Sequence, residues 1–457
     1  MIRQTWTRSV QLATTLRGLF ILACAVLAAI NQSPTRAADR DALRPNVIVI
    51  LTDDMGYADL GCYGSRDIKT PHLDRLAAQG VRLTSFYSSG PVCTPTRAAL
   101  MTGRWQQRVG LEWAIGPGLK EPGLPTREIT LSRMLKDAGY ATALFGKWHL
   151  GYKPEFGPNA HGFDEFFGLL SGNVDHYSHR EINDEADWYE NTSPIDAPGY
   201  STDLITDRAV NFVRRARPAG TPFFLYVAYN AVHWPFQPPG NPADLRQRAT
   251  WFTGTRQEYA RMTEAVDAGV GKILAALDDQ KQAANTFVVF TDDNGGERLS
   301  DMGPLFHHKA TLWEGGIRVP CIIRYPETLP AGKVSDQPAI THDLTATILA
   351  ACRVTPPADR KLDGIDLTPL LTGATPPETR SLFWRIQRAD RSQRAVRHGN
   401  LKFVRDGNIE LLFDLSKDIG ERRDISYEHP DEAADLRRRL AEWEAEMAQE
   451  KPEFTVK

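Results

Sequence analysis

The chain is organised around the stretch Cys93-Thr94-Pro95-Thr96-Arg97-Ala98-Ala99-Leu100-Met101-Thr102-Gly103-Arg104, in which a cysteine stands four residues before an arginine. Pro95 fixes φ and lacks an N–H, which suits the first turn of a helix, and the following alanines and leucine favour helix. Cys93 is then expected just before a helix N-terminus, where the dipole and free N–H groups favour an ionised sulfur or an oxyanion. The alternative is a small buried cysteine in a turn, the usual role of a free cysteine.

An apolar run, Val47 to Leu51, precedes the acidic pair Asp53-Asp54. Five consecutive large apolar residues predict a strand that is buried on both faces. Open α/β sheets place their sites at the carboxyl ends of strands, and two adjacent carboxylates repel each other unless a cation neutralises them. The pair is therefore either an exposed acidic turn or part of a cation site.

Three further buried strands are expected at 140–145, 223–228 and 285–290, and polar side chains follow each of them: Lys147 and His149, then His233, then Asp292, Asp293 and Asn294. Lys147 and His149 are two residues apart, so in an extended chain they would point the same way. Each of these groups by itself also fits a surface residue or a structural histidine. Helices are expected at 131–138, 203–215, 257–277 and 342–351, and 81–87 is expected to be a strand.

The N-terminus is predicted to be a signal peptide, residues 1–37. Arg3, Arg8 and Arg17 precede an apolar run at 18–30, which is short for a membrane span and typical of a signal-peptide core. Cleavage after Ala37 or Ala38 would remove four arginines and lower the formal charge from −3 to −7. A lipid anchor at Cys24 and a retained membrane anchor are the alternatives.

Composition sets broad limits. The 457 residues suffice for one large and one small domain, and 42% hydrophobic with 24% charged residues is an ordinary globular composition. The sequence contains no basic run of the kind that would predict nucleic-acid binding. Cleavage would leave four of the five cysteines, so a disulfide scaffold is excluded.

Cys-x-Pro-x-Arg followed by Ala-Ala-Leu-Met-Thr-Gly-Arg resembles the signature of the formylglycine-dependent sulfatases, of the arylsulfatase and N-acetylgalactosamine-6-sulfatase type. Four further blocks stand in the family's order: Asp53-Asp54, Gly146-Lys147-Trp148-His149, His233-Trp234-Pro235, and Asp293-Asn294-Gly295 with Lys309 before Glu314-Gly315-Gly316. The resemblance runs from Asn46 to the C-terminus. One departure is Thr96, where the family most often has serine. Threonine keeps the hydroxyl, so modification of Cys93 is expected to survive.

The resemblance implies that a maturation enzyme oxidises Cys93 to formylglycine before the chain folds, which would leave three thiols and at most one disulfide. It also implies one Ca²⁺, an ion that prefers oxygen ligands, bound by Asp53, Asp54, residue 93, Asp293 and Asn294. Asp292 is the alternative to Asp293 as the third acidic ligand. His307 and His308 are interpreted as loop residues.

The roles of the family's residues, transferred to the matching residues of this chain, describe covalent catalysis. The formylglycine gem-diol attacks sulfur, and a sulfated hemiacetal then collapses and expels sulfate. The roles implied are these: Arg97 and Lys147 favour the ionised diol, Asp293 accepts its proton, Lys309 and His233 hold the sulfate, His233 protonates the leaving oxygen, and His149 is the base for the collapse.

For the fold, the resemblance implies an alkaline-phosphatase-like α/β sandwich. It would have a large mixed sheet flanked by helices, and a small C-terminal antiparallel sheet with a terminal helix at 430–449. The predicted domains are a catalytic domain at 44–354 and an α+β subdomain at 378–457, joined through proline-rich stretches at 355–357 and 375–377.

The expected activity is hydrolysis of sulfate monoesters by an exported enzyme. The irregular segment 161–202 is interpreted as loops over the site, and its aromatic and polar part, 173–189, favours carbohydrate sulfates over small aryl sulfates. Two alternatives remain: a phosphonate monoester or phosphodiester hydrolase of the same superfamily, and a non-catalytic protein that binds sulfated glycans. The sequence predicts no oligomeric state.

Overall fold

The computed structural model describes residues 44–116, 123–215, 217–218, 220–241, 248–388, 390–452 and 454–456. Residues 45–457 form one compact unit, within which the predicted boundary between 354 and 378 stays a prediction. The predicted signal peptide and Cys24 lie outside the described residues. Within the described ranges, no helix combines the length and the apolar character that a membrane crossing requires.

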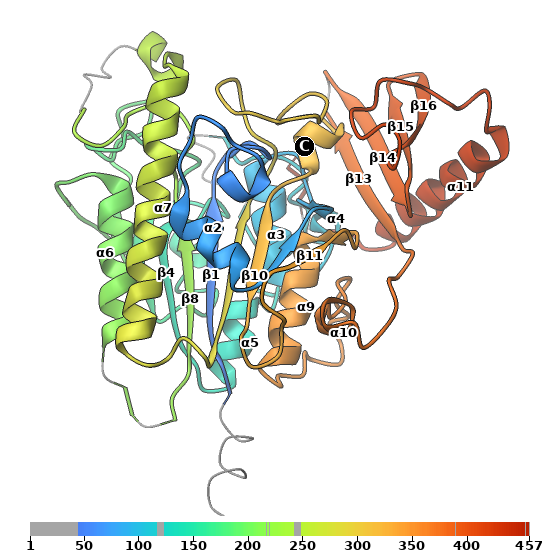
Figure 1. The fold of residues 1–457 in the computed structure, drawn as a ribbon. Helices are drawn as coiled ribbons and strands as arrows, with labels where there is room; N and C mark the ends of the chain where they lie inside the picture. The colour runs from blue at the N-terminus through green and yellow to red at the C-terminus, as the bar shows by residue number, and fades with distance from the viewer. Residues whose placement is uncertain are drawn as a thin grey trace, which may run out of the picture. The chain divides into compact units, whose positions relative to one another are not determined.

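Ten strands form the main sheet, in the order β11-β2-β10-β9-β1-β8-β4-β5-β6-β7 (Figure 1). Its central strands run parallel, and they are β9 (Thr286–Asp292), β1 (Asn46–Thr52), β8 (Phe223–Ala228), β4 (Ala141–Lys147) and β5 (Glu165–Leu169). β10 (Cys321–Arg324) runs antiparallel to both of its neighbours. The outer strands are β2 (Val81–Leu83), β11 (Lys333–Ser335), β6 (Tyr189–Glu190) and β7 (Ser193–Pro194). The predicted large mixed sheet is confirmed.

Helices cover both faces of this sheet, because its central strands are apolar on both sides (Figure 1). One face packs against α2 (Pro71–Ala78), α6 (Ser201–Arg214) and α7 (Arg256–Asp279). The other face packs against α3 (Cys93–Thr102), α5 (Leu131–Asp137) and α9 (Thr341–Ala351). The shorter helices are α4 (Gln106–Val109), α8 (Glu314–Ile317) and α10 (Thr368–Thr372), with 3₁₀ turns at Gly61–Tyr63, Pro154–Phe156 and Arg248–Phe252.

The C-terminal part forms the expected small antiparallel sheet with a terminal helix, drawn in orange to red in Figure 1. Its elements are β13 (Ser381–Gln387), β14 (Ser392–His398), β15 (Leu401–Asp406), β16 (Ile409–Asp414) and α11 (Pro430–Met447). A third apolar core joins this sheet to the catalytic part through Tyr87, Leu312 and Trp313. The small sheet therefore packs against Leu312 and Trp313, which follow Lys309 in the chain.

Two sequence interpretations were wrong in detail. The stretch 81–87 is two strands, since β2 joins the main sheet while β3 (Phe86–Tyr87) pairs with β12 (Ala339–Ile340). The segment 161–202 is not loop throughout, because β5 extends the parallel sheet within it and α6 begins at Ser201. All four described cysteines are free: Cys62, Cys93, Cys321 and Cys352.

Candidate active site

The predicted site residues meet at one edge of the main sheet. Asp53 and Asp54 follow β1, Lys147 ends β4, and Asp293 follows β9, so the parallel strands carry all of them to the same side. α3 begins at this edge with Cys93. One ligand-capable atom from each of Asp53, Asp54, Cys93 and Asp293 lies within 4.8 Å of the others.

Cys93 is the first residue of α3, and not the residue before it as predicted. Its side chain is buried, and its Sγ donates a hydrogen bond to Asp53 Oδ1 at 3.4 Å. Burial, with the charges of Asp293 and Asp53, raises the pKa of the Cys93 thiol well above its usual value. The expectation that the helix N-terminus would give an ionised sulfur is therefore wrong for the thiol, because two carboxylates oppose the dipole.

Arg97 lies one helical turn after Cys93, on the same face of α3. Its guanidinium is fully buried and donates from Nε and Nη2 to Asp293 Oδ2, at 3.0 and 2.8 Å. Nη1 donates to the Lys147 carbonyl at 3.1 Å. Burial and repulsion by Asp53 raise the pKa of Asp293 to about 6, even though Arg97 and Lys147 favour its charged form.

Two lysines neutralise the acidic pair after β1. Lys147 Nζ contacts Asp53 Oδ2 at 2.5 Å, and Lys309 Nζ contacts Asp54 Oδ2 at 2.6 Å. Burial alone would raise the pKa of Asp54, but attraction by Lys309 and His233 outweighs it and lowers that pKa to about 2. Burial likewise opposes the charge of Lys309. Nevertheless, Asp54 and the other acidic groups around Lys309 raise the pKa of Lys309 well above its usual value.

His149 is oriented by a contact that the sequence did not reveal. Its Nε2 donates to the Ile115 carbonyl at 2.9 Å, so the lone pair lies on Nδ1, which is buried and has no partner. Burial and the charge of Lys147 lower the pKa of His149 well below its usual value. β4 ends at Lys147 and His149 has φ +56°, so the extended-chain argument for its orientation does not hold. It nevertheless adjoins the site, because Thr94 Oγ1 donates to its carbonyl at 3.0 Å.

His233 lies beyond the end of β8 and adjoins the acidic pair. Its Nδ1 donates to the Trp234 carbonyl at 2.7 Å, and its Nε2 lies 3.4 Å from Asp54 Oδ2. Burial, with the charges of Lys309 and Lys147, lowers the pKa of His233 to about 3, although Asp54 opposes this shift. In the absence of an anionic ligand, the imidazole is therefore neutral.

The geometry separates the two candidate acids after β9. Asp292 Oδ2 accepts the Met55 N–H at 2.9 Å, and this residue is absent from the group whose ligand atoms converge. Asp293 belongs to that group. Its Oδ1 is buried without a partner, as Asp292 Oδ1 also is, so it is the convergence of ligand atoms that favours Asp293. Asn294 donates from Nδ2 to Asp54 Oδ1 at 2.7 Å, and its own Oδ1 is also unpartnered and buried. Buried carboxylates with unpaired oxygens fit a hard divalent cation such as Ca²⁺.

Several residues support the site through contacts that the sequence did not predict. Asp59 accepts the Gly56 N–H at 2.9 Å and pairs with Arg256 at 2.7 Å, which holds the loop after Asp54. The Thr96 hydroxyl donates to the Gly90 carbonyl at 3.0 Å and accepts the Gly90 N–H at 3.1 Å. These contacts join residues distant in the sequence or use backbone atoms, so residue spacing gave no signal for them.

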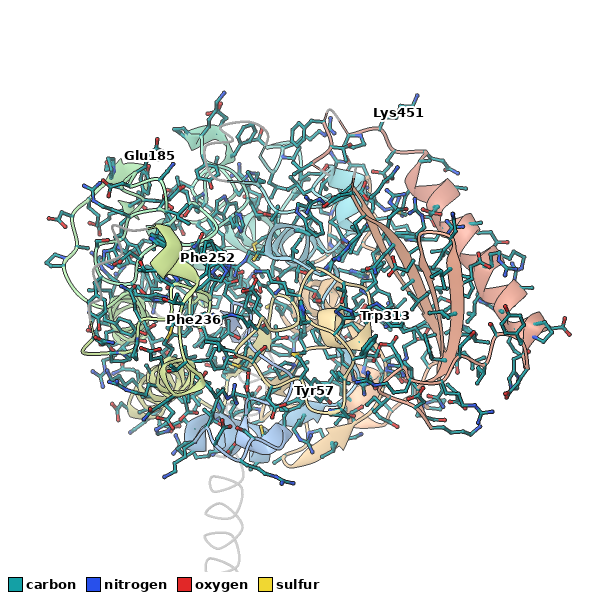
Figure 2. All side chains as sticks on the ribbon, turned by 90° about the horizontal axis from the view of Figure 1, so that it is seen from above. Tyr57, Glu185, Phe236, Phe252, Trp313 and Lys451 are labelled. Atoms are coloured by element: carbon teal, nitrogen blue, oxygen red, sulfur yellow. The ribbon has the colours of Figure 1, made fainter. Side chains whose placement is uncertain are left out.

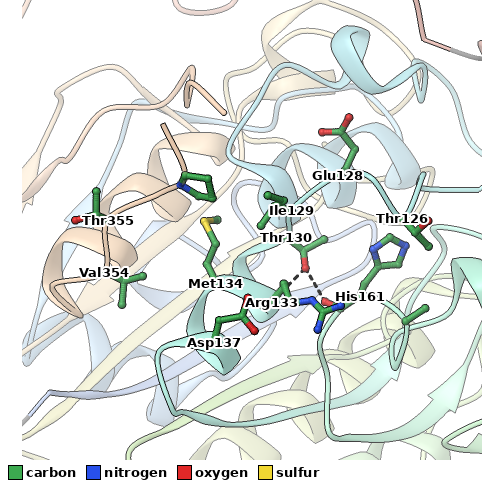
Figure 3. A pocket seen from close by; sticks show the side chains of 12 residues that line it. Thr126, Glu128, Ile129, Thr130, Arg133, Met134, Asp137, His161, Val354 and Thr355 are labelled. Atoms are coloured by element: carbon green, nitrogen blue, oxygen red, sulfur yellow. Dashed lines mark hydrogen bonds between the residues drawn. The ribbon is translucent and has the colours of Figure 1, made fainter. Parts of the chain in front are cut away.

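One pocket lies apart from this set of residues. It lies beside the start of α5 and is lined by Glu128, Arg133, Met134 and Val354, among others (Figure 3). Thr130 Oγ1 donates to the His161 carbonyl there at 2.6 Å. None of the predicted site residues lines it.

A family model described as "Sulfatase" matches residues 45–354, and a second, "N-sulphoglucosamine sulphohydrolase, C-terminal", matches residues 304–450. The chain belongs to the sulfatase family. N-acetylgalactosamine-6-sulfatase of Canis lupus familiaris is 39% identical over 353 residues, covering 72% of this chain and 66% of that protein. The Homo sapiens protein of the same name is 35% identical, with 84% and 82% covered. The chain thus spans about two thirds or more of these relatives.

Solved structures share the fold. The crystal structure of Ps i-CgsB in complex with k-i-k-neocarrahexaose has a TM-score of 0.82 and 32% identity, and the match covers 91% of this chain and 95% of that one. Phosphonate monoester hydrolase of Agrobacterium radiobacter has a TM-score of 0.66 at 21% identity, covering 89% and 96%. At that identity, the second likeness concerns the fold alone.

Proposed function

We propose that this protein is a sulfuric ester hydrolase that cleaves sulfate monoesters of saccharides, with formylglycine at position 93 and one bound Ca²⁺. The observation that carries the proposal is the convergence of Asp53, Asp54, Cys93 and Asp293 at the sheet edge. Three buried or nearly buried cations surround these acids: Arg97, Lys147 and Lys309. Family membership supports the same reaction.

The environment of Cys93 argues for its conversion. A buried thiol whose pKa is raised by neighbouring carboxylates is a poor nucleophile. A hydrated aldehyde at this position would supply the attacking oxygen, and a bound Ca²⁺ would supply positive charge that favours its ionised form. Since the side chain is only 3% exposed, a maturation enzyme would have to reach it before the chain folds.

Asp53, Asp54, Asp293 and Asn294 would hold the cation, through oxygens that include two with no other partner. Arg97 would keep Asp293 oriented, because it binds one oxygen of that carboxylate and leaves the other free. In this arrangement Asp293 is also placed to accept a proton from the nucleophile, because a carboxylate oxygen of Asp293 and the side chain of residue 93 belong to the same converging group.

The remaining polar groups would act on the ester. Lys309 is 12% exposed and has the charge to bind a sulfate oxygen. His233 Nε2 would face the leaving oxygen, and an anionic ester beside it would favour the protonated imidazole that a general acid requires. His149 Nδ1 is a buried lone pair with no protein partner, which suits a base that removes a proton from residue 93 during sulfate release.

A saccharide substrate is supported by the likeness to a structure determined with a neocarrahexaose, at 32% identity over most of both chains. Export is proposed from the predicted signal peptide alone. A phosphonate or phosphodiester hydrolase remains the competing function on the same fold. A purely binding role is disfavoured, because binding alone needs no oriented histidine lone pair.

The test measures the modification of residue 93 and the turnover of substrates on the same preparation. Peptide mass spectrometry across residue 93 should find the aldehyde, and sulfated saccharides should be hydrolysed faster than matched phosphate esters. Cys93→Ala should abolish turnover while the protein stays folded. Full activity with an unmodified thiol, or faster cleavage of the phosphate esters, would overturn the proposal.

A further inference from the structure

An aromatic row leads from the proposed active site to the surface. The ring centroids of His233 and Trp234 are 4.5 Å apart, and those of Trp234 and Phe252 are 4.6 Å apart. Phe252 therefore lies at most about 9 Å from the imidazole that faces Asp54. Figure 2 looks down on the carboxyl edge of the sheet and labels Phe252 there, in the segment that precedes α7.

Burial decreases along this row. His233 is 5% exposed and Trp234 is partly buried, whereas Phe252 is 47% exposed. Among the described residues, only three other large hydrophobic side chains are exposed, namely Val334, Ile409 and Tyr427. An exposed ring within about 9 Å of a proposed catalytic histidine is a candidate surface for binding a ligand.

One ring contact and two hydrogen bonds to backbone carbonyls hold the row in place. Trp251 is buried and meets the Trp234 ring edge-on, with centroids 6.2 Å apart. The Trp234 carbonyl accepts a hydrogen bond from Asn173 Nδ2 at 3.3 Å, and the Phe252 carbonyl accepts one from Arg298 Nη2. Binding to a ring that is already fixed costs little conformational entropy.

We propose that Trp234 and Phe252 form a platform for a pyranose ring of the saccharide, namely the sugar next to the one that carries the cleaved sulfate. The inference rests on the proposed function and adds a specificity site to it. A sugar ring has an apolar face of C–H groups and an edge of hydroxyls, so it can stack on an exposed aromatic ring. The Trp234 and Phe252 rings are tilted by 57° to each other, so the sugar would stack on the Phe252 ring with Trp234 at its side. A sulfated sugar held at Lys309 and His233 would direct its glycosidic neighbour along the row.

The platform makes a prediction about substrate length. An oligosaccharide would contact Phe252, whereas a monosaccharide sulfate held at the same site would not reach it. Phe252→Ala should then lower kcat/KM for the oligosaccharide about tenfold, mainly through KM, and change it less than about twofold for the monosaccharide. Phe252→Tyr keeps the flat ring and should retain most of the oligosaccharide activity.

The experiment uses the mature, aldehyde-containing protein. Carrageenan hexaoses and chondroitin sulfate tetrasaccharides are screened first, and the best substrate is paired with the monosaccharide sulfate of its cleaved sugar. Tyr427→Ala is the matched control, because it removes an aromatic ring that is 95% exposed elsewhere. Phe252→Leu keeps the apolar volume without the flat ring, and it replaces the alanine variant if that one fails to fold.

The outcomes are distinguishable. A selective loss on the oligosaccharide in Phe252→Ala, with rescue by Phe252→Tyr and no effect of Tyr427→Ala, supports the platform. Equal losses on both substrates, or no loss on either, would overturn it while the sulfatase function stands. If the unaltered protein cleaves neither substrate, the proposed function fails first.

Discussion

The charge balance of the site predicts how stability responds to pH when Ca²⁺ is removed. In the cation-free protein, burial and repulsion by Asp53 raise the pKa of Asp293 from 3.8 to about 6. A carboxyl group with a raised pKa binds its proton more tightly in the folded state than in the unfolded state. The stability that this proton contributes is therefore present at low pH and is lost as the pH rises from about 4 to about 6.

The magnitude follows from the size of the shift. Each pKa unit corresponds to about 1.4 kcal/mol, so the shift of Asp293 is worth roughly 3 kcal/mol, most of which is lost between pH 4 and pH 7. Asp54 does not offset this loss, because its pKa of about 2 makes its contribution change only at lower pH. A bound Ca²⁺ would remove the penalty, since it stabilises the ionised carboxylate that the empty site disfavours.

The assay is urea unfolding from pH 4 to pH 7.5, with chelator or with excess Ca²⁺, for the unaltered protein and for Asp293→Asn. With chelator, the free energy of unfolding of the unaltered protein should decrease as the pH rises, by about 2 kcal/mol more than that of the variant. With Ca²⁺ at about a hundred times its Kd, the unaltered protein should gain about 3 kcal/mol and the variant much less.

The control is Asp343→Asn, which alters a buried carboxylate that pairs with Arg380 at 2.6 Å, outside the converging group. It should lower stability equally with chelator and with Ca²⁺. Parallel pH profiles of the unaltered protein and Asp293→Asn in chelator would refute the electrostatic reasoning. A Ca²⁺ gain that survives in Asp293→Asn but is lost in Asp292→Asn would refute the assignment of the ligand.

Three further predictions concern single residues. His149→Gln should lower kcat by about 10²–10⁴-fold without changing the fraction of residue 93 that is aldehyde, and an unchanged kcat would exclude the base role. Lys402→Met should cost about 3–5 kcal/mol in urea unfolding, because it leaves the buried Glu421 without its cation and leaves Glu314 paired with Arg318 alone; a loss below about 1 kcal/mol would contradict the ion cluster. Thr96→Ser keeps both hydroxyl hydrogen bonds and removes one buried methyl, so it should cost about 1 kcal/mol and leave aldehyde formation intact, as mass spectrometry of the peptide can check.

Four of the central strands, β1, β4, β8 and β9, could be predicted because each contains a run of mainly apolar residues, as in Val47 to Leu51, and burial on both faces demands such a run. The polar residues that follow them could be assigned to one site, because parallel strands end at a common edge. The register at 292–293 could not be predicted in this way. The resemblance predicts Asp293, and the binding of Asp292 by the Met55 N–H favours the same register, but a backbone donor far away in the chain leaves no trace in the residue pattern.

Other features were missed for related reasons. β5 contains only five residues between polar, irregular stretches, and its assignment depends on pairing with β4. The tautomer of His149 depends on the carbonyl of Ile115, 34 residues earlier. Lys402 on β15 binds Glu314 at the start of α8, which ties the small sheet to the loop that carries Lys309. Each of these is a long-range contact, for which local spacing carries no information.

The position of Cys93 shows why its chemistry cannot be derived from the helix N-terminus alone. A helix dipole stabilises a nearby negative charge by about 1 kcal/mol, rising to about 2 kcal/mol in favourable, partly buried positions. Against this stand complete burial and two carboxylates, Asp293 and Asp53, and the pKa of the thiol moves upward. The same carboxylates would hold Ca²⁺, so the raised pKa of the thiol describes the site before the cation binds. The acids that suit a cation therefore disfavour the thiolate in the cation-free protein, so the helix N-terminus by itself does not predict an activated cysteine at this position.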